Sequence, residues 1–113
     1  MIIKPMVRNN ICLNSHPTGC EAVVMRQIEY VRRHIACENK GEGIPKLALI
    51  VGCSTGYGLA SRITAAFRYG AATVGISLEK PASETKPGTP GYYNNLVFDR
   101  EARRMGLVSL SLD

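Results

Sequence analysis

Residues 47–62, LALIVGCSTGYGLASR, constrain the fold of this chain more than any other stretch of its sequence. The run LALIV is short, continuous and apolar, which is typical of a strand covered on both faces in a parallel sheet. Three glycines follow it, at Gly52, Gly56 and Gly58. Glycines there permit a sharp turn, let a ligand approach the backbone, and let the next helix pack closely on the strand. The stretch therefore predicts a strand, a glycine turn and a helix.

A helix from about Cys20 to Ala36 is predicted ahead of this unit. Apolar residues recur there at helical intervals, at Val24, Ile28, Val31 and Ile35. Thr18 and Glu21 have the spacing of a capping box, in which the two side chains accept hydrogen bonds from free amides at a helix start. Residues 1–14 predict a short strand or an extended arm, and residues 37–46, CENKGEGIPK, predict a surface linker.

The chain after the glycines repeats the alternation of strands and helices. A helix with Leu59, Ile63 and Phe67 on one side should end at Gly70. A strand over 73–78, a proline- and glycine-rich loop over 80–91, a helix over 92–105 ended by Gly106, and a strand over 108–113 with one face less buried follow. The order strand-helix-strand-helix-strand, after an amino-terminal helix, predicts an α/β fold with a right-handed parallel arrangement.

Length and composition limit the class of protein. With 113 residues the chain has room for one domain or part of one, and 45% hydrophobic with 20% charged residues is ordinary for a folded protein. No apolar stretch approaches the ~18 residues that span a bilayer, and the start lacks the features of a signal peptide, so we expect a cytoplasmic protein without stable membrane association. The net charge is +5, but the basic residues are scattered among acidic ones, which favours solvated helix faces over a nucleic-acid site.

The cysteines give no sign of a disulfide framework or a metal site. They stand at Cys12, Cys20, Cys37 and Cys53 without any C-x-x-C pair, and we expect reduced thiols. Cys12, His16 and Cys20 repeat every four residues and could share one helix face, but Pro17 and Gly19 argue against a continuous helix there. No later pair supplies a convincing fourth ligand, so no metal is expected.

The glycine turn and an acidic residue downstream together predict half of a dinucleotide-binding site in a Rossmann-like fold. The helix that the glycines open presents its amino terminus to negative charge, and Ser54 and Thr55 add hydroxyl donors. Glu79 ends the second strand about 20 residues further on, where an acidic side chain can accept both hydroxyls of an adenosine ribose. Cys53 has no neighbouring histidine base, which favours a small packing residue over a nucleophile.

Three other interpretations of the glycines compete with this one. They could serve only the tight packing of helix on strand. A methyltransferase also pairs a glycine-rich turn with an acidic residue after the second strand. A phosphate-binding P-loop needs lysine and then serine or threonine after its last glycine, whereas Leu59 and Ala60 follow Gly58, which disfavours that class.

Three blocks of the sequence carry a resemblance that covers essentially the whole chain. They are MIIKPMVRNNICLNSHPTGC, GCSTGYGLASRITAAF, and EK followed downstream by GTPGYYNN. With them the chain resembles the amino-terminal quarter of the bacterial NADH-dependent trans-2-enoyl-CoA reductases, which include one class of enoyl-acyl-carrier-protein reductase. The resemblance implies NADH as the cofactor and an enoyl thioester of coenzyme A or acyl-carrier protein as the substrate. It implies cofactor contacts from Gly52, Cys53, Ser54, Thr55, Gly56, Tyr57, Leu78 and Glu79.

The catalytic pattern of that family is missing from these 113 residues. The family pairs a tyrosine, which donates a proton or polarises the thioester carbonyl, with a lysine that holds the nicotinamide ribose, as Tyr-x8-Lys. None of the five tyrosines has a lysine at that spacing, or at the shorter Tyr-x3-Lys spacing of related reductases. We therefore expect residues 1–113 to be a partial NAD-binding domain of an oxidoreductase of fatty acid metabolism, without a catalytic residue, inactive alone and prone to self-association. A stand-alone nucleotide-binding module or a methyltransferase fragment is the alternative.

Overall fold

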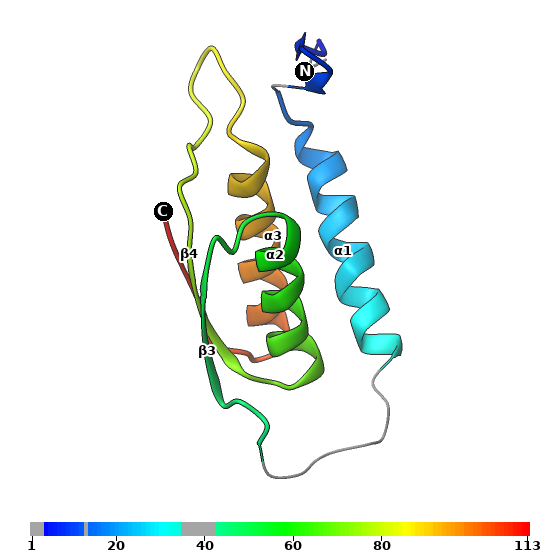
Figure 1. Cartoon of the computed structure of the whole chain (residues 1–113), viewed down its shortest axis with the longest axis vertical. Helices are drawn as coiled ribbons and strands as arrows, with labels where there is room; N and C mark the ends of the chain where they lie inside the picture. Colours follow the sequence, from blue (N-terminus) through cyan, green and yellow to red (C-terminus); the bar gives the residue numbers. More distant parts are fainter. Residues whose placement is uncertain (1–3, 13, 35–42) are drawn as a thin grey trace.

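The computed structural model describes residues 4–12, 14–34 and 43–113. Within these residues the main sheet has three parallel strands in the order β3-β4-β5, beside the helices (Figure 1). In chain order the elements are β1 (Val7–Arg8), β2 (Ile11–Cys12), α1 (Pro17–Arg33), β3 (Leu47–Val51), α2 (Gly56–Ile63), the π-helical turn η1 (Thr64–Arg68), β4 (Ala72–Ile76), α3 (Pro90–Arg104) and β5 (Ser109–Leu112). The α/β class and the order strand-helix-strand-helix-strand are confirmed.

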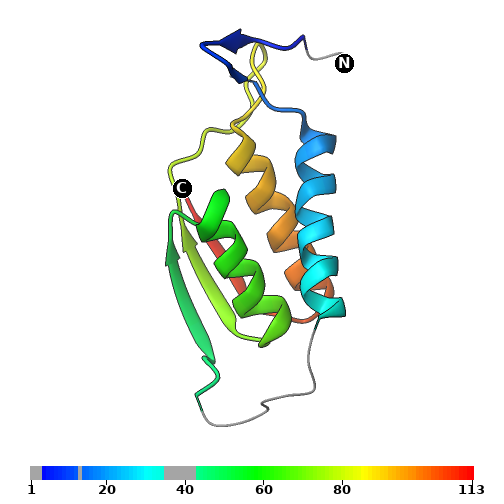
Figure 2. The ribbon, with the colours of Figure 1, turned by 45° about the vertical axis from the view of Figure 1, so that its right-hand side comes forward.

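The helices form two layers on one side of the sheet (Figure 2). α2 packs on β3 and α3 packs on β5, whereas α1 packs on the other helices and lies farthest from the strands of the main sheet. The core lies between the helices and holds Val24, Ile28, Leu59, Ile63, Ala66, Phe67, Val97, Phe98 and Ala102. The rings of Phe67 and Phe98 meet edge to face within it, with centroids 5.4 Å apart. Within the described residues, the apolar stripes predicted for the first two helices therefore face the core, whereas Ile35 lies outside those residues.

The start of α1 differs from the predicted one. The helix begins earlier, at Pro17, which needs no amide partner at the first helical position. His16 is the N-cap residue, and its Nδ1 accepts a hydrogen bond from the amide of Gly19 at 3.1 Å. The predicted capping box of Thr18 and Glu21 is wrong, since both residues lie inside the helix. The predicted end of this helix and most of the linker over 37–46 lie outside the described residues.

The amino-terminal arm forms a two-stranded hairpin. β1 and β2 pair antiparallel. Asn9 and Asn10 between them have positive φ angles of 49° and 65°, as a two-residue type I′ turn requires. Asparagine tolerates this conformation better than most residues, so the Asn-Asn pair was the sequence signal for the second strand.

Glycines follow both later helical segments, as predicted. Gly70 follows η1 with φ 70°, and Gly106 follows α3 with φ 71°, a conformation that glycine adopts without strain. Several element boundaries differ from the prediction by one or two residues, and two of them bear on the site. α3 begins at Pro90, slightly early, and β4 already ends at Ile76. Glu79 therefore lies in the loop beyond the strand.

One face of the sheet is apolar, and the described residues leave it uncovered. Leu47, Leu49 and Val51 of β3 are 67%, 65% and 75% exposed, so the prediction that this strand is covered on both faces is wrong for this chain. Leu110 and Leu112 of β5 are exposed on the same face, because they align with Leu49 and Val51 through their partners on β4 and paired residues share a face of the sheet. Ser109 and Ser111, which alternate with these leucines, face the helices, so the covered face of β5 is the polar one.

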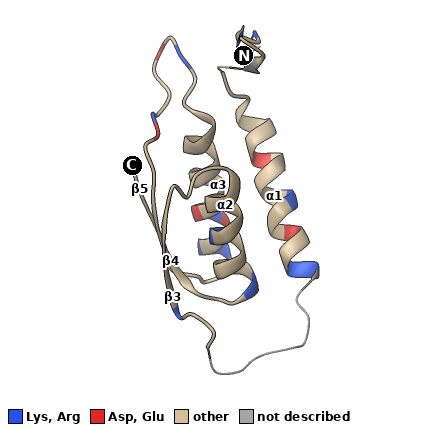
Figure 3. Ribbon diagram, viewed as in Figure 1, with Lys and Arg blue, Asp and Glu red and all other residues tan. Residues whose placement is uncertain are grey.

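Charged residues of both signs are interspersed along α1 and α3 (Figure 3). The exposed pair of Glu29 and Arg33 on α1 is an example, with 2.5 Å between Oε1 and Nη2. An exposed pair of this kind stabilises a helix by about 0.5 kcal/mol or less. None of the helices in the described part of the chain is both long and apolar enough to cross a bilayer.

Candidate functional site

The three glycines of the turn meet different structural needs. Gly52 and Gly56 have positive φ angles of 75° and 54°, which favour glycine whatever the space around them. A Cβ on either would meet no heavy atom within 4 Å, so the space in front of both is open. At Gly58 a Cβ would lie 1.8 Å from the carbonyl oxygen of Gly52. Two glycines thus shape an open turn, and the third lets α2 pack against it.

The amino terminus of α2 offers amides that no side chain of its N-cap residue satisfies. Thr55 is that N-cap residue, and its side chain makes no capping hydrogen bond. The amide of Leu59 donates to the carbonyl oxygen of Thr55 at 3.2 Å. The amides of Gly56, Tyr57 and Gly58 come before it and have no carbonyl one turn earlier in the helix. The positive end of the helix dipole therefore lies at an exposed turn, which suits an anion.

Cys53 and Ser54 turn their side chains into the molecule and are almost completely buried. The amide of Cys53 donates to the carbonyl oxygen of Ile76 at 3.3 Å, and its Sγ lies 3.8 Å from Oδ1 of Asn95. The carbonyl oxygen of Ser54 accepts a hydrogen bond from Nδ2 of Asn94 at 2.9 Å. These contacts attach the turn to β4 and α3. Cys53 occupies the packing position that its sequence context favours.

The structure brings Glu79 to the glycine turn. Ser54 Oγ donates a hydrogen bond to Oε1 of Glu79. Thr89 Oγ1 donates to the other carboxylate oxygen, Oε2. Gly91, in the first turn of α3, leaves room for the carboxylate, because a Cβ there would lie 2.1 Å from Oε1. The carboxylate is therefore held from two sides, beside an open turn.

Two large side chains of the predicted site are almost fully exposed. Tyr57 is 94% exposed and Leu78 is 96% exposed. Single exposed apolar side chains are common on protein surfaces. These two, however, are the sequence neighbours of Gly56 and Glu79, so they border the two features that an extended ligand would need.

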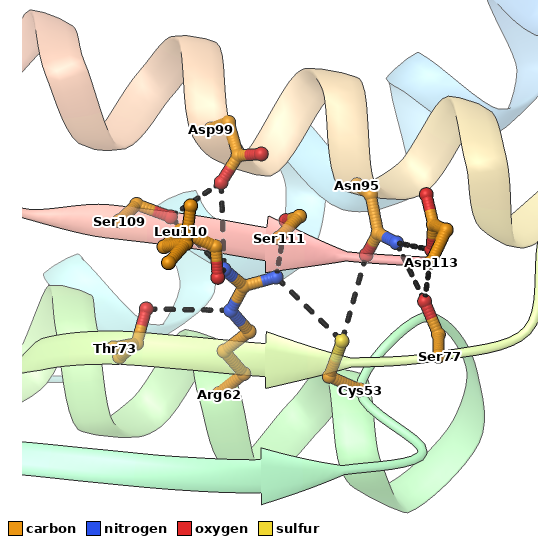
Figure 4. A network of polar contacts seen from close by, with 10 residues as sticks. All are labelled: Cys53, Arg62, Thr73, Ser77, Asn95, Asp99, Ser109, Leu110, Ser111 and Asp113. Atoms are coloured by element: carbon orange, nitrogen blue, oxygen red, sulfur yellow. Dashed lines mark hydrogen bonds and ion pairs between the residues drawn. The ribbon is translucent and has the colours of Figure 1, made fainter.

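A buried arginine ties α2 to the strands behind the turn (Figure 4). Arg62 is completely buried. Its guanidinium donates to Ser111 Oγ at 2.9 Å, and to Ser109 Oγ and the carbonyl oxygen of Leu110 at 3.0 Å each. Asp99 of α3 balances its charge, with 3.4 Å between Nη2 and Oδ1. The polar face of β5 therefore supplies the hydrogen-bond acceptors for this guanidinium.

The arginine also contacts the turn itself. Arg62 Nη1 lies 3.7 Å from Sγ of Cys53 (Figure 4). Gly75 of β4 leaves the space for both groups, because a Cβ there would lie 2.5 Å from Sγ and 2.6 Å from Nη1. The turn, α2 and β5 are therefore connected by one polar network.

The described residues contain no group of three His, Cys, Asp or Glu side chains placed to hold a metal ion. His16 caps α1, and Cys20 lies within that helix. Burial raises the pKa of the Cys20 thiol, which makes its thiolate form less available.

Residues 2–84 match the family described as the NAD(P)H binding domain of trans-2-enoyl-CoA reductase. The chain belongs to this family. The matched range includes the glycine turn, Leu78 and Glu79. Membership in the trans-2-enoyl-CoA reductase family removes the methyltransferase alternative.

The names of similar proteins are consistent with this family assignment. Over its whole length the chain is 64% identical to a trans-2-enoyl-CoA reductase (NADH) of Treponema denticola, of which it covers 29%. It is also 51% identical to an enoyl-acyl-carrier-protein reductase (NADH) of Cytophaga hutchinsonii, of which it covers 27%. The crystal structure of a Treponema denticola trans-2-enoyl-CoA reductase in complex with NAD superposes on the whole chain with a TM-score of 0.94 and 63% identity, and the chain covers 29% of it. The chain thus spans just over a quarter of the length of these relatives.

Thr89 and Gly91 are the site residues that sequence reasoning missed. Both lie in the stretch GTPG, which belongs to a block of the family resemblance but had no assigned role. The available signal was a glycine directly after the proline that opens a helix, since such a glycine often marks the close approach of another group. The partner of that glycine, Glu79, could not be read from the pattern.

Proposed function

We propose that this chain binds NADH at the glycine turn, and that residues 1–113 are part of the NAD-binding domain of an enoyl-thioester reductase. One observation carries the proposal: an open helix start with free amides and a fixed carboxylate lie together at the same turn. Gly56 leaves open space in front of the helix start, and Glu79 is the carboxylate, which Ser54 holds. The family match and the NAD complex of the Treponema denticola relative support the same cofactor.

The residues at the turn fit two parts of the adenosine diphosphate group of NADH, the pyrophosphate and the ribose. The amides after Thr55 and the dipole of α2 suit a pyrophosphate, and Glu79 can accept the ribose hydroxyls. Ser54 contributes by holding Glu79, because its hydroxyl is already donated to that carboxylate. The proposed cofactor-binding residues are Gly52, Cys53, Ser54, Thr55, Gly56, Tyr57, Leu78 and Glu79.

The proposed reaction is the reduction of a trans-2-enoyl thioester to the saturated acyl thioester. NADH would supply a hydride to the β-carbon of the enoyl group, and a proton would be added at the α-carbon. The chain's own residues bind the cofactor and orient it, and no Tyr-x8-Lys pair within them is available to move a proton. The names of the relatives support coenzyme A or acyl-carrier protein as the thioester carrier. A cytoplasmic location, without nucleic acid or stable membrane association, belongs to the same proposal.

Replacing Gly56 by valine tests the pyrophosphate role. The side chain would fill the open space and oppose the positive φ, so NADH affinity should fall about 10- to 100-fold, the equivalent of one charge-assisted hydrogen bond. The measurement is a fluorescence titration of NADH. It uses a fusion protein in which this chain replaces the matching part of the Treponema denticola reductase.

Gly70→Val is the matched control for that experiment. Gly70 has a similar positive φ, 70°, with equally open surroundings, but it lies at the far end of the helical segment. The control should bear the same backbone strain and keep its NADH affinity. Equal NADH affinities of the Gly56 and Gly70 variants would contradict the proposal that the pyrophosphate binds at the turn.

The chain alone is expected to self-associate through the apolar face of its sheet. An edge strand with exposed leucines is a template for association. Leu49→Lys, in the middle of β3, should weaken self-association at least tenfold, a difference of about 1.4 kcal/mol. Val23→Lys, at a half-exposed position of α1, is the control that should change nothing. Sedimentation velocity measures both, and a monomeric wild-type chain would contradict the prediction.

A further inference from the structure

Glu79 stands beyond the sheet, so the strand ladder does not fix its carboxylate. β4 ends at Ile76, and the amide of Ser77 still donates to the carbonyl oxygen of Leu112 at 2.9 Å. Leu78 is then 96% exposed. The position of the Glu79 carboxylate must therefore depend on the side chains that hold it.

The side chain of Thr89 binds that carboxylate instead of capping α3. As the N-cap residue of α3 it would ordinarily accept a hydrogen bond from an amide of the first turn, but its side chain makes no capping bond. The hydroxyl donates to Oε2 of Glu79 and accepts from the amide of Lys80 at 3.0 Å. The amide of Thr89 donates to the carbonyl oxygen of Lys80, also at 3.0 Å. Thr89 thus closes the loop over 80–89 onto Glu79.

The residue before Thr89 is anchored to the segment ahead of α1 and to α3. The carbonyl oxygen of Gly88 accepts a hydrogen bond from Oγ of Ser15, which is buried ahead of α1, at 2.7 Å. Its amide donates to the hydroxyl of Tyr93 at 2.9 Å. A Cβ on Gly88 would lie 2.9 Å from the ring of Tyr92, so the backbone is tightly packed there. The position of Thr89 is therefore set by the fold rather than by the loop.

We propose that Thr89 is a positioning residue that, together with Ser54, clamps the Glu79 carboxylate and thereby sets the preference for NADH over NADPH. The inference rests on the proposed function, in which Glu79 accepts the ribose hydroxyls. Each carboxylate oxygen has two lone pairs. One on each is used by the clamp, which leaves one on each for the two hydroxyls of the adenosine ribose.

The clamp matters for selectivity because a fixed carboxylate cannot move away from a competing ligand. NADPH carries a 2′-phosphate where NADH has a hydroxyl, so it offers no donor there and repels a carboxylate. A carboxylate free to swing outward would avoid this repulsion and would also bind the NADH ribose less well. Loss of the clamp should therefore weaken NADH binding and leave NADPH binding equal or better.

The test is Thr89→Val in the fusion protein. Valine keeps the shape of threonine and removes the hydroxyl. The Kd of NADH should rise about fivefold, as expected for one lost hydrogen bond. The Kd of NADPH divided by the Kd of NADH should fall by the same factor or more. With saturating NADH, kcat should be unchanged, because the substitution does not touch the reacting end of the cofactor.

Two further variants separate the clamp from a general structural effect. Thr89→Ser keeps the hydroxyl and should restore the wild-type ratio. Thr85→Val makes the same change at an exposed position of the same loop and should leave the ratio within about twofold of wild type. If Thr89→Val fails to fold, Gly91→Ala takes its place, because its Cβ displaces the carboxylate while both hydroxyls remain.

Glu79→Ala distinguishes a failure of this inference from a failure of the proposed function. If wild-type fusion protein does not bind NADH, or if Glu79→Ala keeps the full NADH preference, the proposed role of Glu79 is wrong and the clamp falls with it. If Glu79→Ala loses the preference while Thr89→Val keeps it, only the clamp is wrong. Parallel losses in both variants, with rescue by Thr89→Ser, support the inference.

Discussion

Replacing Gly58 by alanine is expected to destabilise the chain by about 3 kcal/mol. The new Cβ would lie 1.8 Å from the carbonyl oxygen of Gly52, and neither can rotate away, because the oxygen belongs to the backbone and the backbone fixes the position of the Cβ. α2 would have to move off the turn and off β3. Thermal unfolding at a fixed protein concentration should record a fall in Tm of more than about 10 °C.

Gly19→Ala is a closely matched control for that substitution. Gly19 and Gly58 are each the third residue of their helix. A Cβ on Gly19 would lie 3.6 Å from Cβ of His16, which is ordinary van der Waals contact. Alanine there should leave stability unchanged or raise it by up to about 1 kcal/mol, since it lowers the entropy of the unfolded chain. Equal Tm values for the two variants would show that α2 tolerates a wider spacing.

The order of elements could be predicted because its signals are local. Helical periodicity, the apolar run LALIV and the glycines that end helices each depend on a few neighbouring residues. The same is true of the glycine turn, whose three positions were assigned from spacing alone. Boundaries were less certain: the capping box at the start of α1 was wrong because His16, a less common N-cap residue, takes that role.

The orientation of the sheet could not be predicted. LALIV has no alternation, so nothing in the run distinguishes its covered face from its uncovered one. In SLSL the alternation is clear, but the usual rule puts the leucines inside. The serines lie inside because Arg62 needs their hydroxyls, and an arginine in a helix is assigned to the surface by default.

The clamp on Glu79 also depends on distant parts of the chain. Its two donors, Ser54 and Thr89, come from the turn after β3 and the loop before α3. Their spacing from Glu79 follows no periodic pattern, since it reflects how the loops fold back on the sheet. Sequence could identify the acidic residue as a candidate, but only the fold identifies what holds it.

Replacing Arg62 by methionine is expected to destabilise the chain by about 3–5 kcal/mol. Methionine fills much of the same volume but leaves Asp99, whose side chain is only 15% exposed, as a partly buried charge without its ion-pair partner, with Ser109 Oγ still donating to it. It also leaves Ser109, Ser111 and a backbone carbonyl of β5 without their donor. Thermal unfolding measures the loss, at the concentration used for the glycine variants.

Arg68→Met is the control, because Arg68 is an exposed arginine of the same helical segment and should change stability by less than about 0.5 kcal/mol. The double replacement of Arg62 and Asp99 by apolar residues adds a sharper test. Removing both charges should recover part of the loss, because the cost of the single variant includes an unpaired carboxylate. A double variant no more stable than Arg62→Met would instead assign the stability to the serine contacts of β5, and so to the joining of α2 with the far edge of the sheet.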